Sequence, residues 1–315
     1  MQKKVTIIGA GAVGSTTAYS LLARGAASEV VLIDINTEKA LGEALDIKQA
    51  TPFLANCDIY AGDYRDAVGS DVVIITSGIG RKPGQTRLEL VQTNVGIIKS
   101  IANEIVKYAP NAIYILVANP VDILTYAFIK YTGLPKSQVM GTGTVLDTIR
   151  LRTRLAEIYH VNKQQVHANV LGEHGDTSFV AWSSATIAGV PVDEYYASIA
   201  SAYNLPTEYK RDDVENYVRK SGGKIISRKG CTVYGIAMSS THIVNTLAGN
   251  AETALTVSSL HEGEYGISDV CLSSLSLVDS TGVRSILTQK LSDDEFQKLH
   301  ASAEALKAVI KGANI

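Results

Sequence analysis

The chain has 315 residues, of which 46% are hydrophobic, so it is long enough for about two domains and can fill a sizeable core. Its 29 basic and 31 acidic residues give a net charge of -2 without long runs of either sign, which excludes the electrostatic footprint expected for a nucleic-acid partner or an anionic membrane. A small diffusible substrate is the better expectation.

The cysteines predict neither a disulfide scaffold nor a zinc site. Cys57, Cys231 and Cys271 are odd in number, widely separated and without metal-ligand spacing. We therefore expect no metal and a reducing cytoplasm. The apolar run after Lys3 and Lys4 is too short for a signal peptide, and no segment holds about 18 uninterrupted apolar residues, so no membrane span is expected.

A glycine-rich motif follows the first predicted strand. Residues 5–8 are apolar and β-branched, which indicates a buried strand, and residues 15–24 have helical spacing. Between them stands G-x-G-x-x-G, whose glycines permit a tight turn and let backbone amides approach a pyrophosphate at a helix N-terminus. The motif glycines are Gly9, Gly11 and Gly14.

An acidic residue ends the second predicted strand, at residues 29–33. Asp34 lies twenty positions after Gly14, where a carboxylate can bond the ribose hydroxyls of a dinucleotide. It would repel a 2′-phosphate, which favours NAD over NADP. The alternative, a glycine-rich turn followed by a chance aspartate, is disfavoured by the complete strand, turn, helix, strand and aspartate context.

Helix and strand patterns then alternate, which predicts an α/β fold with a doubly wound parallel sheet and helices on both faces. Helical spacing covers residues 37–49 and 88–108, and strands are predicted at 58–61, 71–76 and 112–117. Cofactor should lie at the carboxyl ends of these strands, next to residues 76–78 and 119–122. Asn119 precedes a proline and must be non-helical, which leaves its amide free to face a ligand, although Asn-Pro is also an ordinary turn opener.

Glycines and cations alternate in residues 78–87, between a predicted strand and a predicted helix. Such a polar, glycine-hinged loop beside a cofactor cleft is a candidate lid that swings Arg81 and Arg87 over a bound anion. The alternative is a solvated basic loop.

The stretch 141–177 carries three groups suited to acid–base chemistry on a small carboxylate. Asp147 and Arg150 are three positions apart at the start of a predicted helix and can share one face. A predicted strand at 166–171 then delivers His174 on a tight turn. A guanidinium binds a carboxylate in bidentate fashion, an imidazole titrates near neutral pH, and an aspartate can fix its tautomer. A structural salt-bridge network is the alternative.

The second half is less regular. Helical or mixed spacing covers 182–189, 193–204, 212–226 and 234–248, strands are predicted at 257–260 and 270–275, and an amphipathic helix at 293–311. We place the domain boundary near Thr142, so that residues 1–142 form a dinucleotide-binding domain and residues 143–315 a substrate and catalytic domain.

Five motifs in order resemble the NAD-dependent L-lactate and malate dehydrogenase family, specifically its bacterial lactate dehydrogenase branch. They are GAGAVG with a following LIDI, the loop RKPGQTR, VANPVD, GTVLDTIRLR and LGEHGDT, and the resemblance covers nearly the whole chain. It implies a Rossmann domain followed by a mixed α/β catalytic domain, in a homotetramer.

The resemblance also implies residue roles. His174 would exchange a proton with the C2 oxygen of the substrate, Asp147 would orient it, Arg150 would bind the substrate carboxylate, and Arg87 on the lid would polarise the carbonyl. Asn119 would face both substrate and cofactor. Besides the motif glycines, the positions that match the cofactor lining of the family are Val13, Asp34, Lys39, Tyr64, Gly78, Ile79, Asn119 and Thr142.

Four further positions bear on the substrate and on regulation. Arg81 stands where lactate dehydrogenases commonly carry glutamine, and an arginine there is typical of malate dehydrogenases. Thr232 matches the residue that narrows the lactate dehydrogenase pocket. Arg152 and His167 match positions that bind fructose 1,6-bisphosphate between subunits of bacterial lactate dehydrogenases; the alternative is a surface arginine and a satisfied polar histidine.

These positions favour an L-lactate dehydrogenase that converts pyruvate to L-lactate with NADH. The first alternative is a malate dehydrogenase or a dual-specificity enzyme acting on oxaloacetate and malate. A third, from another class, is a non-catalytic NAD-binding or structural protein that has kept the fold.

Overall fold

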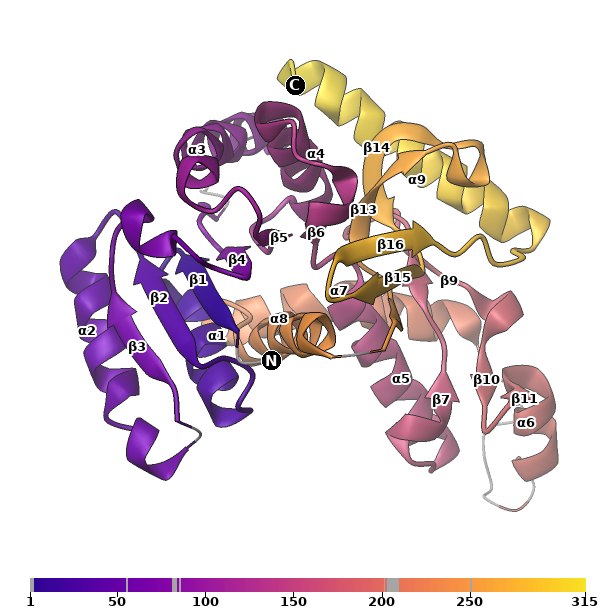
Figure 1. The fold of residues 1–315 in the computed structure, drawn as a ribbon. Helices are drawn as coiled ribbons and strands as arrows, with labels where there is room; N and C mark the ends of the chain where they lie inside the picture. Colours follow the sequence, from indigo (N-terminus) through magenta and orange to yellow (C-terminus); the bar gives the residue numbers. More distant parts are fainter. Residues whose placement is uncertain are drawn as a thin grey trace.

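The computed structural model describes residues 3–54, 56–80, 84, 86–200, 202, 210–249 and 251–315. Within these residues an 8-stranded sheet has the order β14-β13-β6-β5-β4-β1-β2-β3 (Figure 1). The strands from β6 to β3 are parallel, whereas β13 and β14 are antiparallel additions at one edge. The predicted doubly wound parallel sheet is confirmed. Its strands are β1 Lys4–Ile8, β2 Glu29–Ile33, β3 Asp58–Ala61, β4 Val72–Ile75, β5 Ile113–Leu116, β6 Val139–Gly141, β13 Ser258–Glu262 and β14 Ser268–Ser273.

Helices cover both faces of the sheet because successive strand residues point to opposite sides. Ile7 and Ile74 pack into one core cluster with α1, α2 and α8, whereas Ile8 and Ile75 pack into another with α3, α4 and α9. Burial of each such side chain contributes about 2 kcal/mol before the entropy cost of ordering it. The helices are α1 Ala12–Ala23, α2 Thr37–Lys48, α3 Arg87–Tyr108, α4 Val121–Thr132, α8 Tyr234–Ala248 and α9 Asp293–Ala313.

Two of the long helices begin at capping boxes that the sequence encodes. Thr86 and Glu89 exchange side-chain and backbone hydrogen bonds at the start of α3, and Ser292 and Glu295 do the same for α9. Each box satisfies amides that would otherwise lack a partner in the first turn. The predicted helices 88–108 and 293–311 are therefore confirmed within two residues at each end.

The second half adds helices and small antiparallel sheets beside the large sheet, which confirms its mixed α/β character. Leu151 and Leu155 pack with Val214 and Val218 in a third core cluster, which joins α5 to α7. The remaining helices are α5 Val145–Tyr159, α6 Val192–Ile199 and α7 Arg211–Lys229. The small sheets consist of β7 Val166–His167 with β10 Thr186–Ile187 and β11 Val190–Pro191, β8 Val170–Leu171 with β9 Phe179–Val180, and β12 Thr253–Leu255 with β15 Ser276–Asp279 and β16 Gly282–Ile286.

The predicted single strand at 166–171 is wrong, because β7 and β8 belong to different sheets. The intervening backbone turns to other partners: the carbonyl of Ala168 accepts a hydrogen bond from Arg152, and the carbonyl of Asn169 accepts one from the amide of Ala181. Residues 182–189 are a short 3-10 turn followed by β10 rather than a helix. The helix expected at 193–204 ends at Ile199, and residues 203 and 204 lie outside the described part.

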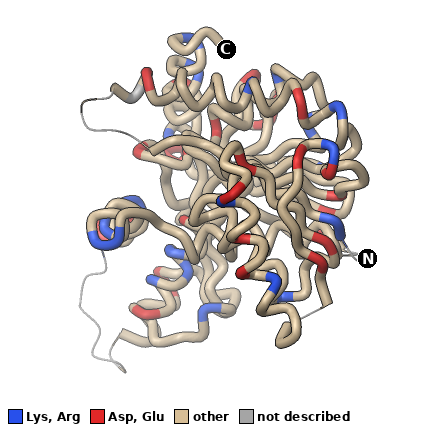
Figure 2. The backbone as a smooth tube through the Cα atoms, turned by 90° about the vertical axis from the view of Figure 1, so that its left-hand side faces the viewer, with Lys and Arg blue, Asp and Glu red and all other residues tan. Residues whose placement is uncertain are grey.

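Charged side chains of both signs are interspersed along the chain (Figure 2). Within the described residues, no helix combines the length and apolar character that crossing a bilayer requires. The same part of the chain contains no cluster of three or more His, Cys, Asp or Glu side chains arranged to hold a metal ion.

Candidate active site

A crevice of about 510 Å³ opens at the carboxyl ends of β1, β2 and β4. Asp34 lies in its wall, where one carboxylate oxygen accepts a hydrogen bond from the amide of Ala10 at 2.7 Å and the other from the amide of Asn36 at 2.9 Å. These bonds join the end of β2 to the glycine-rich turn. Six predicted cofactor residues line this crevice: Gly9, Gly11, Asp34, Tyr64, Gly78 and Ile79.

The glycine-rich turn fits the pyrophosphate of a dinucleotide. A side chain at Gly11 would meet no atom within 4 Å, so the backbone is open to a ligand there, whereas a Cβ at Gly14 would lie 1.8 Å from the carbonyl oxygen of Gly9. Among the described residues, no side chain caps α1, and its first turn has no acidic residue. Its amides and the positive end of its dipole therefore suit an anion.

The other predicted cofactor residues lie elsewhere. Asn119 and Thr142 line a second cavity, described below. Val13, Gly14 and Lys39 line neither cavity: Val13 packs against the core, Gly14 allows the turn to approach α1, and Lys39 is exposed on α2.

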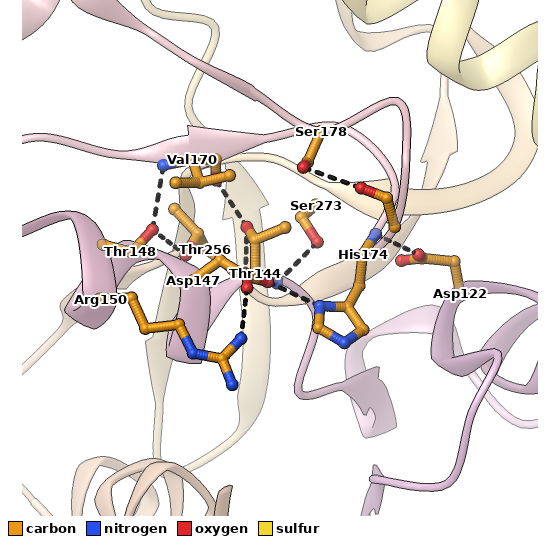
Figure 3. Close-up of polar contacts among 11 residues, drawn as sticks. Asp122, Thr144, Asp147, Thr148, Arg150, Val170, His174, Ser178, Thr256 and Ser273 are labelled. Carbon is orange, nitrogen blue, oxygen red and sulfur yellow. Dashed lines mark hydrogen bonds and ion pairs between the residues drawn. The ribbon is translucent and has the colours of Figure 1, made fainter. Parts of the chain in front are cut away.

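The second cavity, of about 200 Å³, is lined by Asp147, Arg150 and His174, and we call it the acid–base cavity. Asp147 lies between the other two side chains (Figure 3). One of its oxygens is 2.6 Å from Nδ1 of His174, and the other accepts a hydrogen bond from Nη1 of Arg150 at 2.9 Å. An ionised carboxylate only accepts hydrogen bonds, so Nδ1 carries a proton and Nε2 is the nitrogen left for a ligand.

Charge determines the protonation of this trio. Burial would lower the pKa of His174, but the charge and hydrogen bond of Asp147, with a contribution from the charge of Asp122, raise that pKa above its usual 6.5. Burial likewise opposes the ionised form of Asp147, yet His174 and then Arg150 outweigh it and lower the pKa of Asp147. The free site therefore favours a carboxylate beside an imidazolium.

Hydroxyl groups attach the first turn of α5 to the strands beneath it (Figure 3). The amide of Thr144 donates to Oγ of Ser273 at 3.0 Å, and Oγ1 of Thr148 accepts from the amide of Val170 at 3.0 Å. Thr148 and Thr256 also lie 3.1 Å apart, Oγ1 to Oγ1. These buried bonds fix the backbone that carries Asp147.

The turn that carries His174 is held by the terminal helix. The amide of Glu173 donates to Oγ of Ser302 on α9 at 2.7 Å, and the Thr177 hydroxyl donates to the Glu173 carboxylate at 2.7 Å. Because the single Thr177 proton is used there, the Ser302 hydroxyl donates to Oγ1 of Thr177 across 2.8 Å. A closed ring of hydrogen bonds results, which the sequence motifs did not reveal.

A second residue missed by sequence reasoning connects the two cavities. Asn94, on α3 and 1% exposed, accepts a hydrogen bond from the amide of Ile79 and donates to the carbonyls of Ile79 and Asn119. It holds the loop after β4 against the loop after β5. The buried side-chain amide of Asn94 thus supports the walls of both the cofactor crevice and the acid–base cavity.

The structure describes only some of the predicted substrate residues. Arg150, Asn119 and Thr232 line the acid–base cavity. Arg81 lies outside the described residues, and so does the side chain of Arg87, whose backbone begins α3.

Helix α7 contributes lining residues that were not predicted. Arg219 and Gly222 face the acid–base cavity, and Arg219 donates to the carbonyl of Ser178 at 2.8 Å. With Glu215 and Ile226 they follow helical spacing along one face, a signal that could have placed them on a shared surface but not against this cavity.

The predicted regulatory pair lies on adjoining elements. Arg152, on α5, donates to the carbonyl of Ala168 and to Oδ1 of Asn169, both at 3.0 Å, while His167 is exposed on β7. His242 on α8 was not predicted; burial, then the charge of Arg152, lowers its pKa.

A dinucleotide crevice beside a carboxylate, imidazole and guanidinium cluster defines an oxidoreductase of the doubly wound α/β class. Comparison with family models then identifies the family. The model for the lactate/malate dehydrogenase NAD-binding domain matches residues 3–141, and the model for the α/β C-terminal domain of the same family matches residues 144–314. The chain belongs to the lactate/malate dehydrogenase family, and NAD is its cofactor.

Relatives along the full length carry a more specific name. The L-lactate dehydrogenase of Acetivibrio thermocellus is 47% identical over 313 residues, which cover 99% of this chain and 98% of the relative. That of Clostridium perfringens strain SM101 is 46% identical over 312 residues, 99% and 98% of the two chains. The crystal structure of a minor L-lactate dehydrogenase from Enterococcus mundtii superposes with a TM-score of 0.93 at 40% identity and covers 98% of both chains.

Proposed function

We propose that the protein is an NAD-dependent L-lactate dehydrogenase that interconverts pyruvate and L-lactate. The observation that carries the proposal is the position of Asp147 between His174 and Arg150 in one cavity wall. The full-length similarity to proteins named L-lactate dehydrogenase supports lactate as the product.

Each side chain of the trio has a separate task. Arg150 binds the substrate carboxylate through two parallel hydrogen bonds, which places C2 near His174. In reduction, Nε2 of His174 donates its proton to the C2 oxygen, and in oxidation it takes the hydroxyl proton back. Asp147 holds the imidazole in the tautomer that exposes Nε2 and stabilises its charged form. NADH supplies the hydride to C2 when bound, and NAD accepts it in the reverse direction.

We further assign the lid arginines by the family resemblance. Arg87 polarises the C2 carbonyl and stabilises the developing alkoxide. Arg81 would pair with the second carboxylate of oxaloacetate, which makes a malate or dual-specificity enzyme the alternative function. Thr232 lines the acid–base cavity, which supports pyruvate, the smaller of the two substrates.

Parallel kinetics decide between these substrates. We expect a higher kcat/KM for pyruvate than for oxaloacetate with NADH; a preference of about a hundredfold for oxaloacetate, about 2.7 kcal/mol, would overturn the lactate assignment. If oxaloacetate is reduced, Arg81→Gln should lower that rate, and an unchanged rate removes the malate alternative. A protein without turnover of either substrate would be the non-catalytic protein of the third hypothesis.

We also propose activation by fructose 1,6-bisphosphate bound at Arg152 and His167, whose guanidinium and imidazole a two-fold axis would double to match two phosphates. The bisphosphate should lower the pyruvate concentration at half-maximal rate, and Arg152→Gln should abolish this effect. Arg154→Gln, on the same helix but in an exposed pair with Glu157, is the matched control. A flat titration between about pH 6 and 7 contradicts the proposal.

A homotetramer is proposed from the resemblance, and exposed apolar side chains support self-association. Tyr19 and Tyr234 line one shallow hollow beside α2, while Leu45 and Met238 are exposed on α2 and α8. Sedimentation velocity tests the assembly, and a monomer would contradict it.

We retain residues 1–142 and 143–315 as the proposed domains. The free thiols Cys57, Cys231 and Cys271 support a reducing, cytoplasmic location. Cell fractionation tests the location.

A further inference from the structure

A second buried carboxylate contacts the proposed acid–base residue from the side opposite Asp147. Asp122, in the first turn of α4, is 2% exposed. One of its oxygens, Oδ2, accepts a hydrogen bond from the backbone amide of His174 at 2.7 Å (Figure 3). This places Asp122 beneath the residue that exchanges the proton, although its own side chain does not line the acid–base cavity.

A carboxylate is more than this contact requires. An amide donor needs one neutral acceptor, which asparagine would supply at lower cost, because burying a charge is expensive unless it is paired. The other oxygen, Oδ1, has no hydrogen bond of regular geometry among the described residues, although the Ser258 hydroxyl lies close enough to stabilise the carboxylate. The Ser258 hydroxyl and the His174 amide offset only part of the cost of burial, since the pKa of Asp122 remains raised, and a nearby positive charge adds to the compensation.

The compensating charge is the imidazolium of His174. Attraction between the two groups favours the ionised form of Asp122 and the protonated form of His174. Glu173 on the same turn repels the Asp122 carboxylate, and Cys271 on β14 faces it as a neutral thiol. Burial raises the pKa of Asp122 to about 6, so it is charged at neutral pH.

Two carboxylates favour the protonated form of His174, Asp147 most and Asp122 after it. Arg150 opposes protonation of His174 and also shares the carboxylate of Asp147. The formal charges of Asp147 and Arg150 sum to zero, so these two groups and an imidazolium alone would carry a net positive charge. With Asp122 ionised, the four groups are neutral when His174 is protonated.

We propose that Asp122 is a positioning residue of the acid–base site: its carboxylate fixes the backbone of His174, and its negative charge supports the protonated imidazole that delivers the proton. This inference rests on the proposed role of His174 and adds a second carboxylate to it.

Asp122→Asn keeps an acceptor for the His174 amide and removes the charge. The 15N titration of the His174 imidazole, assigned by comparison with His174→Asn, should show a pKa lower by about one unit. The pKa that limits kcat/KM for pyruvate on the basic side should fall by the same amount, so kcat/KM should be about tenfold lower at pH values above the His174 pKa of both proteins. KM should change by less than about twofold because Arg150 is untouched.

Asp71→Asn is the matched control, since Oδ2 of Asp71 also accepts a backbone amide, that of Lys4 at 2.8 Å, away from both cavities. It should leave the His174 titration and the pH profile in place. An Asp122→Asn protein that titrates like wild type overturns the inference. Undiminished turnover by His174→Asn would instead overturn the proposed function, while the imidazole titration still decides the charge effect of Asp122.

If Asp122→Asn does not fold, the inference can be tested on the wild-type protein. The backbone amide of His174 bonds directly to Asp122, so its 15N shift should titrate in two steps, one from the carboxyl and one from the imidazole. A single step that coincides with the imidazole overturns the inference.

Discussion

Replacement of Asp147 by asparagine tests the arrangement on which the proposed mechanism depends. The side chain is 9% exposed and accepts from His174 at 2.6 Å and from Arg150 at 2.9 Å. The amide oxygen of the new side chain could still accept from one of these groups, so the expected loss is close to that of one hydrogen bond to a charged group, about 1.5–3 kcal/mol. This corresponds to a fall in kcat/KM for pyruvate of roughly tenfold to 150-fold.

The loss should depend on pH, because the charge of Asp147 is the main support for protonated His174. Its removal lowers the pKa of His174, so the basic limb of the reduction profile moves to lower pH and the deficit grows as pH rises. The assay is steady-state oxidation of NADH with pyruvate across that range.

Asp269→Asn is the matched control for this variant. The Asp269 carboxylate also accepts from a ring substituent, the Tyr126 hydroxyl at 2.9 Å, and from a cation, Lys130 at 2.8 Å, but it lines neither cavity. It should leave kcat/KM unchanged. An Asp147→Asn enzyme whose kcat/KM and basic limb match those of wild type would refute the reasoning.

Three further changes have defined outcomes. The pKa of His174 is raised above 6.5 and that of Asp147 is lowered below 3.8, so the pairing of the two side chains stabilises the fold fully between pH 3.8 and 6.5 and less outside this range. Urea unfolding should show that His174→Gln lowers the free energy of unfolding, and that this destabilisation becomes smaller as pH rises above 6.5. A destabilisation that grows with pH would contradict the coupling between protonation and folding. Gly14→Ala, whose Cβ would lie 1.8 Å from the Gly9 carbonyl oxygen, should weaken NADH binding at least about tenfold by fluorescence titration; unchanged affinity would exclude the tight turn. Gly223→Ala, in the interior of α7 with no atom within 4 Å of its added Cβ, should raise unfolding free energy by about 0.5–1 kcal/mol, and a decrease would reveal an unrecognised constraint.

The parallel sheet and the nucleotide crevice could be predicted because their determinants are local. Residues 72–75 and 113–116 are short apolar runs that become fully buried strands. The glycine motif and Asp34 are close in sequence, and they meet at adjacent strand ends in the structure. Such features need only the period of the pattern and the rules of crossover connections.

The later strands were predicted only in part. The runs predicted at 257–260 and 270–275 correspond to β13 and β14, although these strands bury Ser258 and Ser273. β12, β15 and β16 were not predicted, because they are short strands that mix polar with apolar residues and lack the apolar signal of a core strand. The serine hydroxyls are compensated by tertiary contacts, such as the amide of Thr144 on Ser273. Context of this kind outweighs local propensity. Helix α4 was not predicted, and its residues 121–129 are all buried, so it lacks the polar face that marks a surface helix.

In the acid–base cavity, too, the sequence could predict the contacts between neighbouring residues but not those between distant ones. The sequence placed Asp147 and Arg150 on one helical face, and the structure has them 2.9 Å apart. It could not show that Ser302, more than a hundred residues after Glu173, closes the ring that holds the turn carrying His174. Nor could helical spacing alone orient Arg219 toward this cavity.

This difference predicts where the molecule tolerates change. The crevice is built from adjacent strand ends, so distant substitutions should leave it intact. The acid–base cavity instead depends on buried hydroxyl and carboxylate contacts from α4, α9 and β14, each of which fixes a backbone rather than touching a ligand. Because a misplacement of about 1 Å in a reacting group can cost about a hundredfold in rate, these remote contacts should affect turnover more than NADH binding.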